Sequence, residues 1–100
     1  MIFLKTRTGT IFVNSYEGTT PRHILNAFVE LSGLNANEFK LITLGRQVVG
    51  EDMDRTCIDD LRWHTLEIIH LVTSAAAEAF LLEHNIHRIE TERPAAGFRP

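Results

Sequence analysis

The chain has 100 residues, a length typical of one domain, and 44% of them are hydrophobic, which suffices for a modest core. Its formal charge of −3 argues against non-specific nucleic-acid binding, and no apolar run approaches the ~20 residues that span a membrane. The single cysteine, Cys57, cannot form an internal disulfide and suits a reducing compartment. Composition therefore predicts a cytoplasmic or nuclear protein with neither nucleic-acid nor membrane partners.

Two short apolar segments, residues 2–6 and 10–16, flank Thr8-Gly9 and predict a β-hairpin, because glycine supplies the positive φ that tight turns need. Side chains of a strand alternate between its two faces, so one face of this hairpin should enter the core. The better core face consists of four aliphatic residues: Ile2, Leu4, Ile11 and Val13. Phe3 and Phe12 then share the outer face. They form either a cross-strand pair that stabilises the hairpin or a secondary binding patch.

The segment GTTPRHILNAFVELSGL predicts a helix of about three turns. Thr20 is a suitable N-cap, and Pro21 fits the first helical position. Between Ile24 and Leu31, apolar residues recur at spacings of four and three, which is typical of an amphipathic helix. Gly33 is a suitable C-cap. This helix should cover one face of the sheet.

The segments KLITLGRQVV and TLEIIHLV predict three more strands, with a tight turn at Gly45-Arg46 between the first two. Alternation along the first of them turns Lys40, Ile42 and Leu44 outward. In the last strand we expect Ile69 and Leu71 to face outward as well. The element order is β-β-α-β-β-β. It predicts an α+β fold in which a mixed sheet surrounds one helix, the β-grasp arrangement.

The composition changes after Val72, where TSAAAEAFLLEHNIHRIETERP contains no strong turn residue before Pro94. Three consecutive alanines favour a helix over residues 73–93, and Leu82, Ile86 and Ile89 continue an apolar stripe along it. The stripe would dock the helix on its own sheet, pair it with a second copy in a homodimer, or await another protein. Residues 94–100 should form a flexible tail.

Three stretches resemble the ubiquitin-like family: IFLKTRTG at the start, TTP before the helix, and KLITLGRQVV in the middle. TLEIIHLV completes a similarity that covers residues 1–72. The stretch TIFVNSYEGTT also looks like the second strand of Elongin B, an adaptor in that family that is not conjugated. The resemblance implies a ubiquitin-like β-grasp domain at residues 1–72, followed by the additional helix and the tail.

The resemblance further implies a protein-binding patch on the outer face of the sheet. Ile42 and Ile69 would form its centre. The other members of the patch would be Leu44, Leu71, Lys40 and Gly45. Arg7 stands where the family's hairpin leucine would be, and Glu67 stands where its patch histidine would be. Receptors that grip that leucine should therefore bind weakly.

Covalent modifiers of this family end in glycine, whereas here no glycine follows the last predicted strand until Gly97. The sequence shows no catalytic constellation and no set of converging ligands around His84 and His87, and it implies no metal and no cofactor. We therefore expect a non-enzymatic, non-conjugated adaptor or interaction module, whose partners are other proteins, including components of the ubiquitin pathway. The alternative is a covalent modifier matured by cleavage after Gly97.

Overall fold

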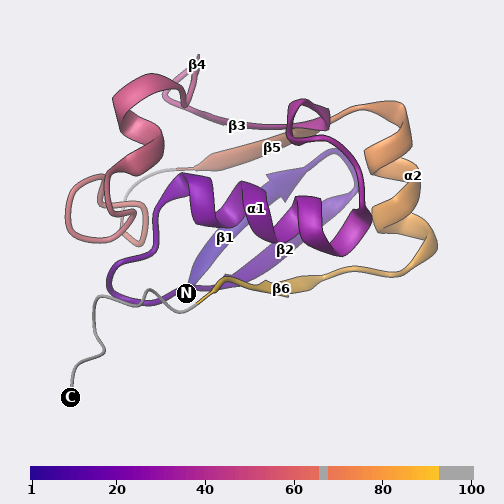
Figure 1. The fold of residues 1–100 in the computed structure, drawn as a ribbon, viewed down its shortest axis with the longest axis horizontal. Coiled ribbons are helices and arrows are strands. Elements are labelled where there is room, and N and C mark those ends of the chain that lie inside the picture. The colour runs from indigo at the N-terminus through magenta and orange to yellow at the C-terminus, as the bar shows by residue number, and fades with distance from the viewer. Residues whose placement is uncertain (66–67, 93–100) are drawn as a thin grey trace.

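The computed structural model describes residues 1–65 and 68–92 and has an α+β architecture, in which a six-stranded mixed sheet carries a helix on one face (Figure 1). The strands lie in the order β4-β3-β5-β1-β2-β6. Their bounds are β1 (Ile2–Thr6), β2 (Gly9–Asn14), β3 (Phe39–Thr43), β4 (Arg46–Gln47), β5 (Ile69–Thr73) and β6 (Arg88–Glu90). The helices are α1 (Pro21–Ser32) and α2 (Ala75–Glu83), with short 3₁₀ helices η1 (Ala36–Glu38) and η2 (Gly50–Asp54). The predicted tail at residues 94–100 lies outside the described residues.

The β1–β2 hairpin forms as its sequence predicts. The antiparallel register pairs Leu4 with Ile11 and Phe3 with Phe12. The predicted core face is confirmed, because its four aliphatic side chains are all buried: Ile2, Leu4, Ile11 and Val13. On the opposite side Phe3 remains 54% exposed. The hairpin therefore presents its two phenylalanines to the outside while its aliphatic face builds the core.

Helix α1 begins and ends at the predicted caps. The Thr20 side chain accepts a hydrogen bond from the His23 backbone N–H, and the His23 ring accepts one from the Thr20 N–H in return. At the other end Gly33 adopts φ 76° and donates its N–H to the Val29 carbonyl. Ile24 and Phe28 are fully buried against the sheet. Capping and the apolar stripe thus fix both the length of α1 and the face that it turns inward.

The predicted phase of strand β5 is wrong. Its registers pair Leu4 with Ile69 and Leu41 with Leu71, so both β5 residues point into the core and are only 1% and 3% exposed. The neighbouring Ile68 and Val72 are 63% and 45% exposed instead. Four of the five residues from Ile68 to Val72 are aliphatic, so this sequence offers almost no polar alternation to define the phase. Pairing with β1 and β3 decides it, because a shift of one residue reverses every side chain.

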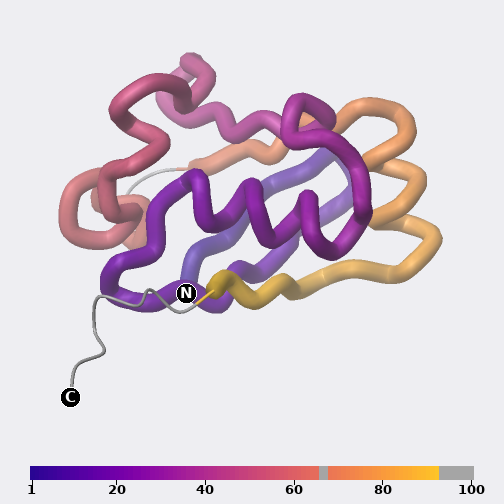
Figure 2. The backbone as a smooth tube through the Cα atoms, in the orientation of Figure 1, coloured from indigo at the N-terminus to yellow at the C-terminus, as the bar shows by residue number. Residues whose placement is uncertain are grey.

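The predicted helix over residues 73–93 is also wrong in length. Helix α2 ends at Glu83, and Asn85 follows in the left-handed conformation with φ 55°. The Ile86 N–H then donates to the Leu81 carbonyl at 2.9 Å, and the Asn85 N–H donates to the Leu82 carbonyl, which together form a Schellman motif. The chain turns back and runs along β2 as β6 (Figure 2). Ile89 therefore lies on a strand, where it is 5% exposed.

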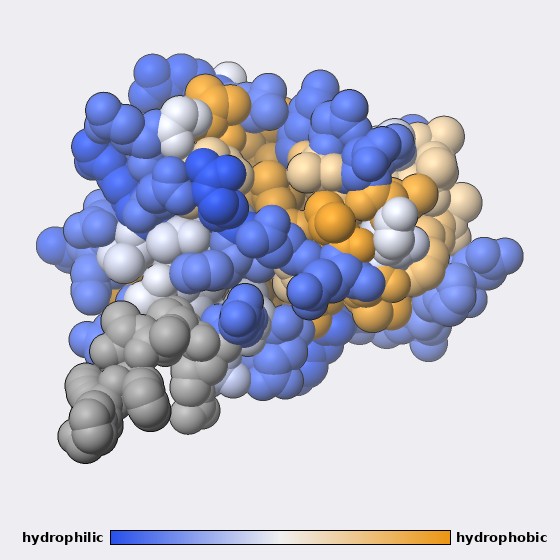
Figure 3. Space-filling view, in the orientation of Figure 1, coloured by the Kyte–Doolittle hydropathy of each residue, from blue (hydrophilic) through white to orange (hydrophobic). Residues whose placement is uncertain are grey.

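One hydrophobic core unites these elements. Ala77 and Leu81 of α2 and Ile89 of β6 belong to the same buried cluster as Phe28 of α1. Seen from the α1 side, hydrophobic residues gather around the C-terminal half of α1 and over α2, whereas the region of η2 is largely hydrophilic (Figure 3). The segment after β5 is thus built into the domain.

The connection between β4 and β5 is anchored at the rim of this core. Its Cys57 donates the backbone N–H to the Thr19 carbonyl at 2.8 Å and accepts from the Trp63 N–H at 2.9 Å. Burial raises the pKa of the Cys57 thiol to about 12. Nearby, the Arg22 side chain donates two hydrogen bonds to Asp54, and this contact holds the pKa of the Asp54 carboxyl below its ordinary value.

Candidate functional site: the outer face of the sheet

We use the term outer face for the side of the sheet opposite α1. No described helix lies across it (Figure 1). Strand alternation and pairing place residues of five strands on this face, including Asn14 and Glu90 of the β2–β6 pair. Nine others on this face are apolar or basic. They are Phe3, Lys5, Phe12, Lys40, Ile42, Ile68, His70, Val72 and Arg88.

Four apolar side chains follow one another across the outer face. The rings of Phe3 and Phe12 make an edge-to-face contact with centroids 5.1 Å apart and planes at 80°. The register of Leu4 with Ile69 brings Ile68 beside Phe3, and Val72 follows further along β5. Such an exposed apolar row on a small domain is typical of an interaction surface.

Basic side chains border this apolar row. Lys5 pairs with His70, and Lys40 pairs with Val72, so both lysines of the chain lie on the outer face. The Arg88 guanidinium lies 5.9 Å from the centroid of Phe12 and donates to the Asn14 side chain at 3.3 Å. Within residues 1–65 and 68–92, neither lysine forms an ion pair. The outer face is therefore positively charged on a protein whose net charge is −3.

The structure places only part of the predicted patch on this face. Ile42 is half-buried and pairs with His70, while Lys40 is exposed as expected. Leu44 and Gly45 form the β3–β4 turn with φ values of 54° and 75°, and Leu44 is 74% exposed. Ile69 and Leu71 are excluded from the patch because they are core residues. Glu67 lies outside the described residues.

Sequence reasoning missed Ile68, His70, Val72 and Arg88. The first three occupy the alternate positions of the same strand, so the signal was present but assigned to the wrong side. Arg88 was assigned to a helix. The parallel pairing of β6 with β2 brings it beside Phe12, and a contact between residues 76 positions apart has no local signal.

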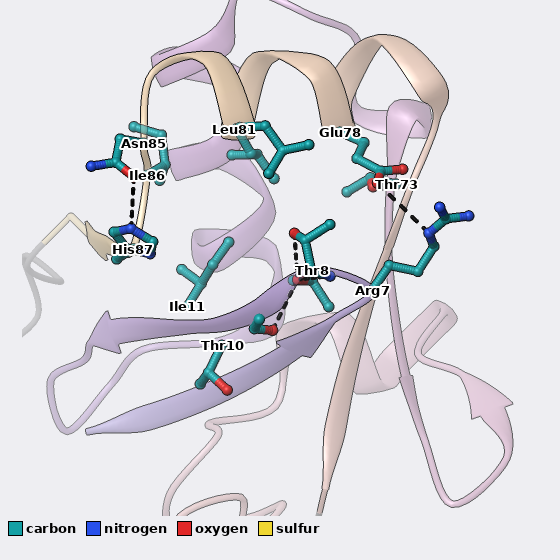
Figure 4. Close-up of a pocket in the computed structure, with 13 residues that line it drawn as sticks. Arg7, Thr8, Thr10, Ile11, Thr73, Glu78, Leu81, Asn85, Ile86 and His87 are labelled. Carbon is teal, nitrogen blue, oxygen red and sulfur yellow. Dashed lines mark hydrogen bonds and ion pairs between the residues drawn. The ribbon is translucent and has the colours of Figure 1, made fainter.

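Arg7 and two of the predicted helix-docking residues, Leu82 and Ile86, lie elsewhere, around a small pocket between the hairpin turn and α2 (Figure 4). Arg7 forms an ion pair with Glu78 at 3.6 Å. Ile86 is half-buried against the core at this pocket, whereas Leu82 is 56% exposed. The stripe predicted through Leu82, Ile86 and Ile89 is therefore not a single docking face, because the helix ends before its last two members.

Other chemistry is sparse in the part of the chain that the structure describes. Here no three His, Cys, Asp or Glu side chains converge as a metal site. The His84 ring stacks on Phe80 with centroids 4.3 Å apart, and His87 hydrogen-bonds the Asn85 side chain at 2.8 Å. Cys57 is buried. Among these residues, no helix has the length and apolar character required to cross a bilayer.

No family model, curated protein or solved structure matches the chain. The geometry of the outer face is therefore the basis for a functional proposal.

Proposed function

We propose that this protein is a ubiquitin-like β-grasp domain. Its sheet supports this fold, because the parallel pair β1 and β5 lies at the centre and antiparallel neighbours lie on both sides. The helix α1 follows the first hairpin and packs across the sheet. The stretches IFLKTRTG and KLITLGRQVV carry the resemblance at sequence level. The addition of α2 and β6 would then be a departure from the family's usual outline.

The proposed activity is binding of other proteins through the outer face, as a cytoplasmic or nuclear adaptor, including in the ubiquitin pathway. The observation that carries it is the apolar row of the exposed Phe3, Ile68 and Val72 and the half-buried Phe12, on a sheet face that no described helix covers. Burial of such side chains stabilises a complex by about 1.5–3 kcal/mol each at most. We assign no catalytic step and no cofactor to this face.

The bordering charges favour a partner other than a second copy. Lys5, Lys40 and Arg88 would face one another across a symmetric dimer, because both copies present the same patch. Like charges at an interface oppose association, whereas carboxylates on a different protein would complement them. The preferred partner is therefore apolar at its centre and acidic at its rim.

The proposal favours a non-conjugated module over the alternative of cleavage after Gly97. What supports this choice is that the chain continues from β5 into α2 and β6, which share the core. Gly97 itself lies outside the described residues. Intact-mass measurement of the protein from cells would distinguish the two alternatives. Loss of Phe98–Pro100 together with larger adducts would support a covalent modifier and contradict the non-conjugated module.

The test of the outer face is a matched pair of double variants. Ile68→Ser with Val72→Ser should lower recovery of bound proteins about tenfold, as expected when interface residues worth about 1.4 kcal/mol are lost. Leu31→Ser with Leu44→Ser changes two exposed apolar residues, 46% and 74% exposed, that do not belong to the apolar row, and it should leave recovery unchanged. Quantitative mass spectrometry after proximity labelling provides the readout, and equal recovery in both variants would refute the proposal.

A further inference from the structure

The outer edge of strand β6 is the feature from which we infer a second binding site. Among the described residues, β6 is the terminal strand of the sheet and pairs only with β2, in parallel. The Phe12 N–H donates to the His87 carbonyl at 2.8 Å, and the Thr91 N–H donates to the Asn14 carbonyl at 3.2 Å. Backbone groups alternate in direction along a strand, so those of Arg88 and Glu90 point away from β2.

Strand β6 lies beside α1 in the fold (Figure 1). A groove runs along this edge, between β6 and α1. Its volume is about 570 Å³. Helix α1 contributes His23, Asn26, Ala27 and Glu30 to it, and the chain at Glu90–Glu92 contributes the other wall. A strand added to a sheet lies about 4.8 Å from its neighbour, so it would run along this groove. Peptides that bind by strand addition use both a sheet edge and a neighbouring wall of side chains.

The charges around the groove indicate the chemistry of its occupant. Glu30 and Glu92 are exposed at its rim, and neither forms an ion pair with another residue in the ranges 1–65 and 68–92, whereas the Glu90 carboxylate accepts a hydrogen bond from the Tyr16 hydroxyl at 2.8 Å. The nearest basic side chain on β6, Arg88, is directed to Phe12 and Asn14 on the outer face. Unpaired carboxylates favour lysine or arginine on a ligand, and they disfavour pairing with the β6 edge of a second copy.

We propose that the β6 edge and the α1 groove bind an extended, basic peptide segment of another protein, which adds to the sheet as a seventh strand. The backbone groups of Arg88 and Glu90 supply the hydrogen bonds, and Glu30 and Glu92 select the basic side chains. This site is distinct from the outer face and does not depend on the function proposed for it.

The probe is a display library of random decapeptides selected on the full chain. Selected peptides should be enriched in lysine and arginine and in β-branched residues at alternate positions. With a resynthesised peptide, amide hydrogen exchange at Arg88 and Glu90 should slow at least tenfold, whereas exchange at Val72 should not change. Affinity should fall with added salt and with Glu30→Gln or Glu92→Gln.

Glu90→Pro and Glu90→Ala form the matched pair for the backbone contact. Both remove the carboxylate, but only proline removes the outward N–H, which β2 does not use, and proline is tolerated at an edge strand. Glu90→Pro should weaken peptide binding at least tenfold relative to Glu90→Ala. Should Glu90→Pro fail to fold, N-methylation of the peptide gives the same information. One peptide is methylated at its odd-numbered residues and another at its even-numbered residues, and only the peptide whose N–H groups face β6 should lose binding.

Several results would overturn the proposal: selection of no peptide above background, selection of acidic sequences, or equal binding by the two Glu90 variants. Loss of peptide binding in Val72→Ser would place the peptide on the outer face and contradict the site. A dimer that only Glu90→Pro dissociates would assign the edge to a second copy instead. The outer-face variants test a different surface. If they did not change protein capture, peptide binding at the β6 edge would be unaffected, so the two proposals can fail separately.

Discussion

At the scale of single residues, Phe3 and Phe12 show how one contact can serve both the fold and the surface. Their rings meet edge to face at 5.1 Å although Phe3 is 54% exposed. Aromatic pairs of this geometry contribute about 0.5–1.5 kcal/mol beyond the area that they bury. The pair therefore gives Phe3 a role in the stability of the hairpin although its ring is largely on the outer face.

A double-mutant cycle tests this pair. Phe3→Ala and Phe12→Ala should each lower the free energy of unfolding, and the double variant should show a coupling energy of about 0.5–1.5 kcal/mol in urea titrations. Phe3→Ala combined with Leu44→Ala serves as the control, because Leu44 lies on the distant β3–β4 turn, and its coupling should be near zero. Coupling near zero for the phenylalanines would contradict the contact.

The Cys57 thiol gives a second prediction at this scale. Its pKa is raised to about 12 by burial, and the thiolate is the form that reacts, so the native protein should resist iodoacetamide between pH 7 and 9. Labelling should rise in step with unfolding as urea is added. A Leu44→Cys variant in a Cys57→Ala background provides an exposed thiol and should react at once. Rapid labelling of native Cys57 would mean that the connection between β4 and β5 opens readily.

At the scale of elements, the sequence predicts those whose signals are local. Thr20, Pro21 and Gly33 determine both ends of α1 through capping and backbone conformation. The phase of β5 cannot be read in this way, because Ile68 and Ile69 are equally apolar and only the partner strands distinguish them. The same is true of the outer face, since its members come from five strands that meet only in the folded sheet.

The end of α2 did carry a local signal that the helical spacing of Leu82, Ile86 and Ile89 obscured. Asn85 is one of the few residues that tolerate a positive φ, and it occupies the position after the helix where such a residue is common. The spacings of four and three between Leu82, Ile86 and Ile89 are compatible with one continuous helix. They are equally compatible with a helix that ends after Leu82 and a strand that contains Ile89. The decisive contribution is tertiary, because β6 pairs with β2, which lies more than 70 positions earlier in the chain.

Substitution of Asn85 tests this element boundary. Asn85→Ala replaces a residue that tolerates the left-handed conformation at φ 55° with one that does not, so it should lower the free energy of unfolding by about 1 kcal/mol. Asn85→Gly also loses the hydrogen bond to His87 but tolerates this φ, so it should be more stable than Asn85→Ala. Thermal unfolding of the two variants gives the comparison. Greater stability of Asn85→Ala would indicate that α2 extends through this position.

At the scale of the whole molecule, one core contains residues from two segments that differ in composition. Residues 73–92 differ in composition from the preceding segment, yet Ala77, Leu81 and Ile89 pack into the same cluster as Phe28 and Ile11. Charge is also distributed over the whole molecule: both lysines lie on the outer face, while Glu30 and Glu92 border the groove beside β6. Two surfaces of opposite charge on one small domain would let it contact two different partners at the same time.

Ile89 and Leu82 decide whether β6 belongs to the cooperative unit. Ile89 is 5% exposed within the core and Leu82 is 56% exposed, although the two would be equivalent on one continuous amphipathic helix. Ile89→Ala should therefore cost about 2–4 kcal/mol of unfolding free energy, and Leu82→Ala should cost less than about 1 kcal/mol. Fluorescence of the buried Trp63 in urea reports on unfolding of the core and should shift to a lower midpoint in Ile89→Ala, in a single transition with an unchanged slope. An unchanged Trp63 transition in Ile89→Ala would show that β6 does not unfold together with the rest of the domain. Equal losses of unfolding free energy in Ile89→Ala and Leu82→Ala would instead support one continuous helix.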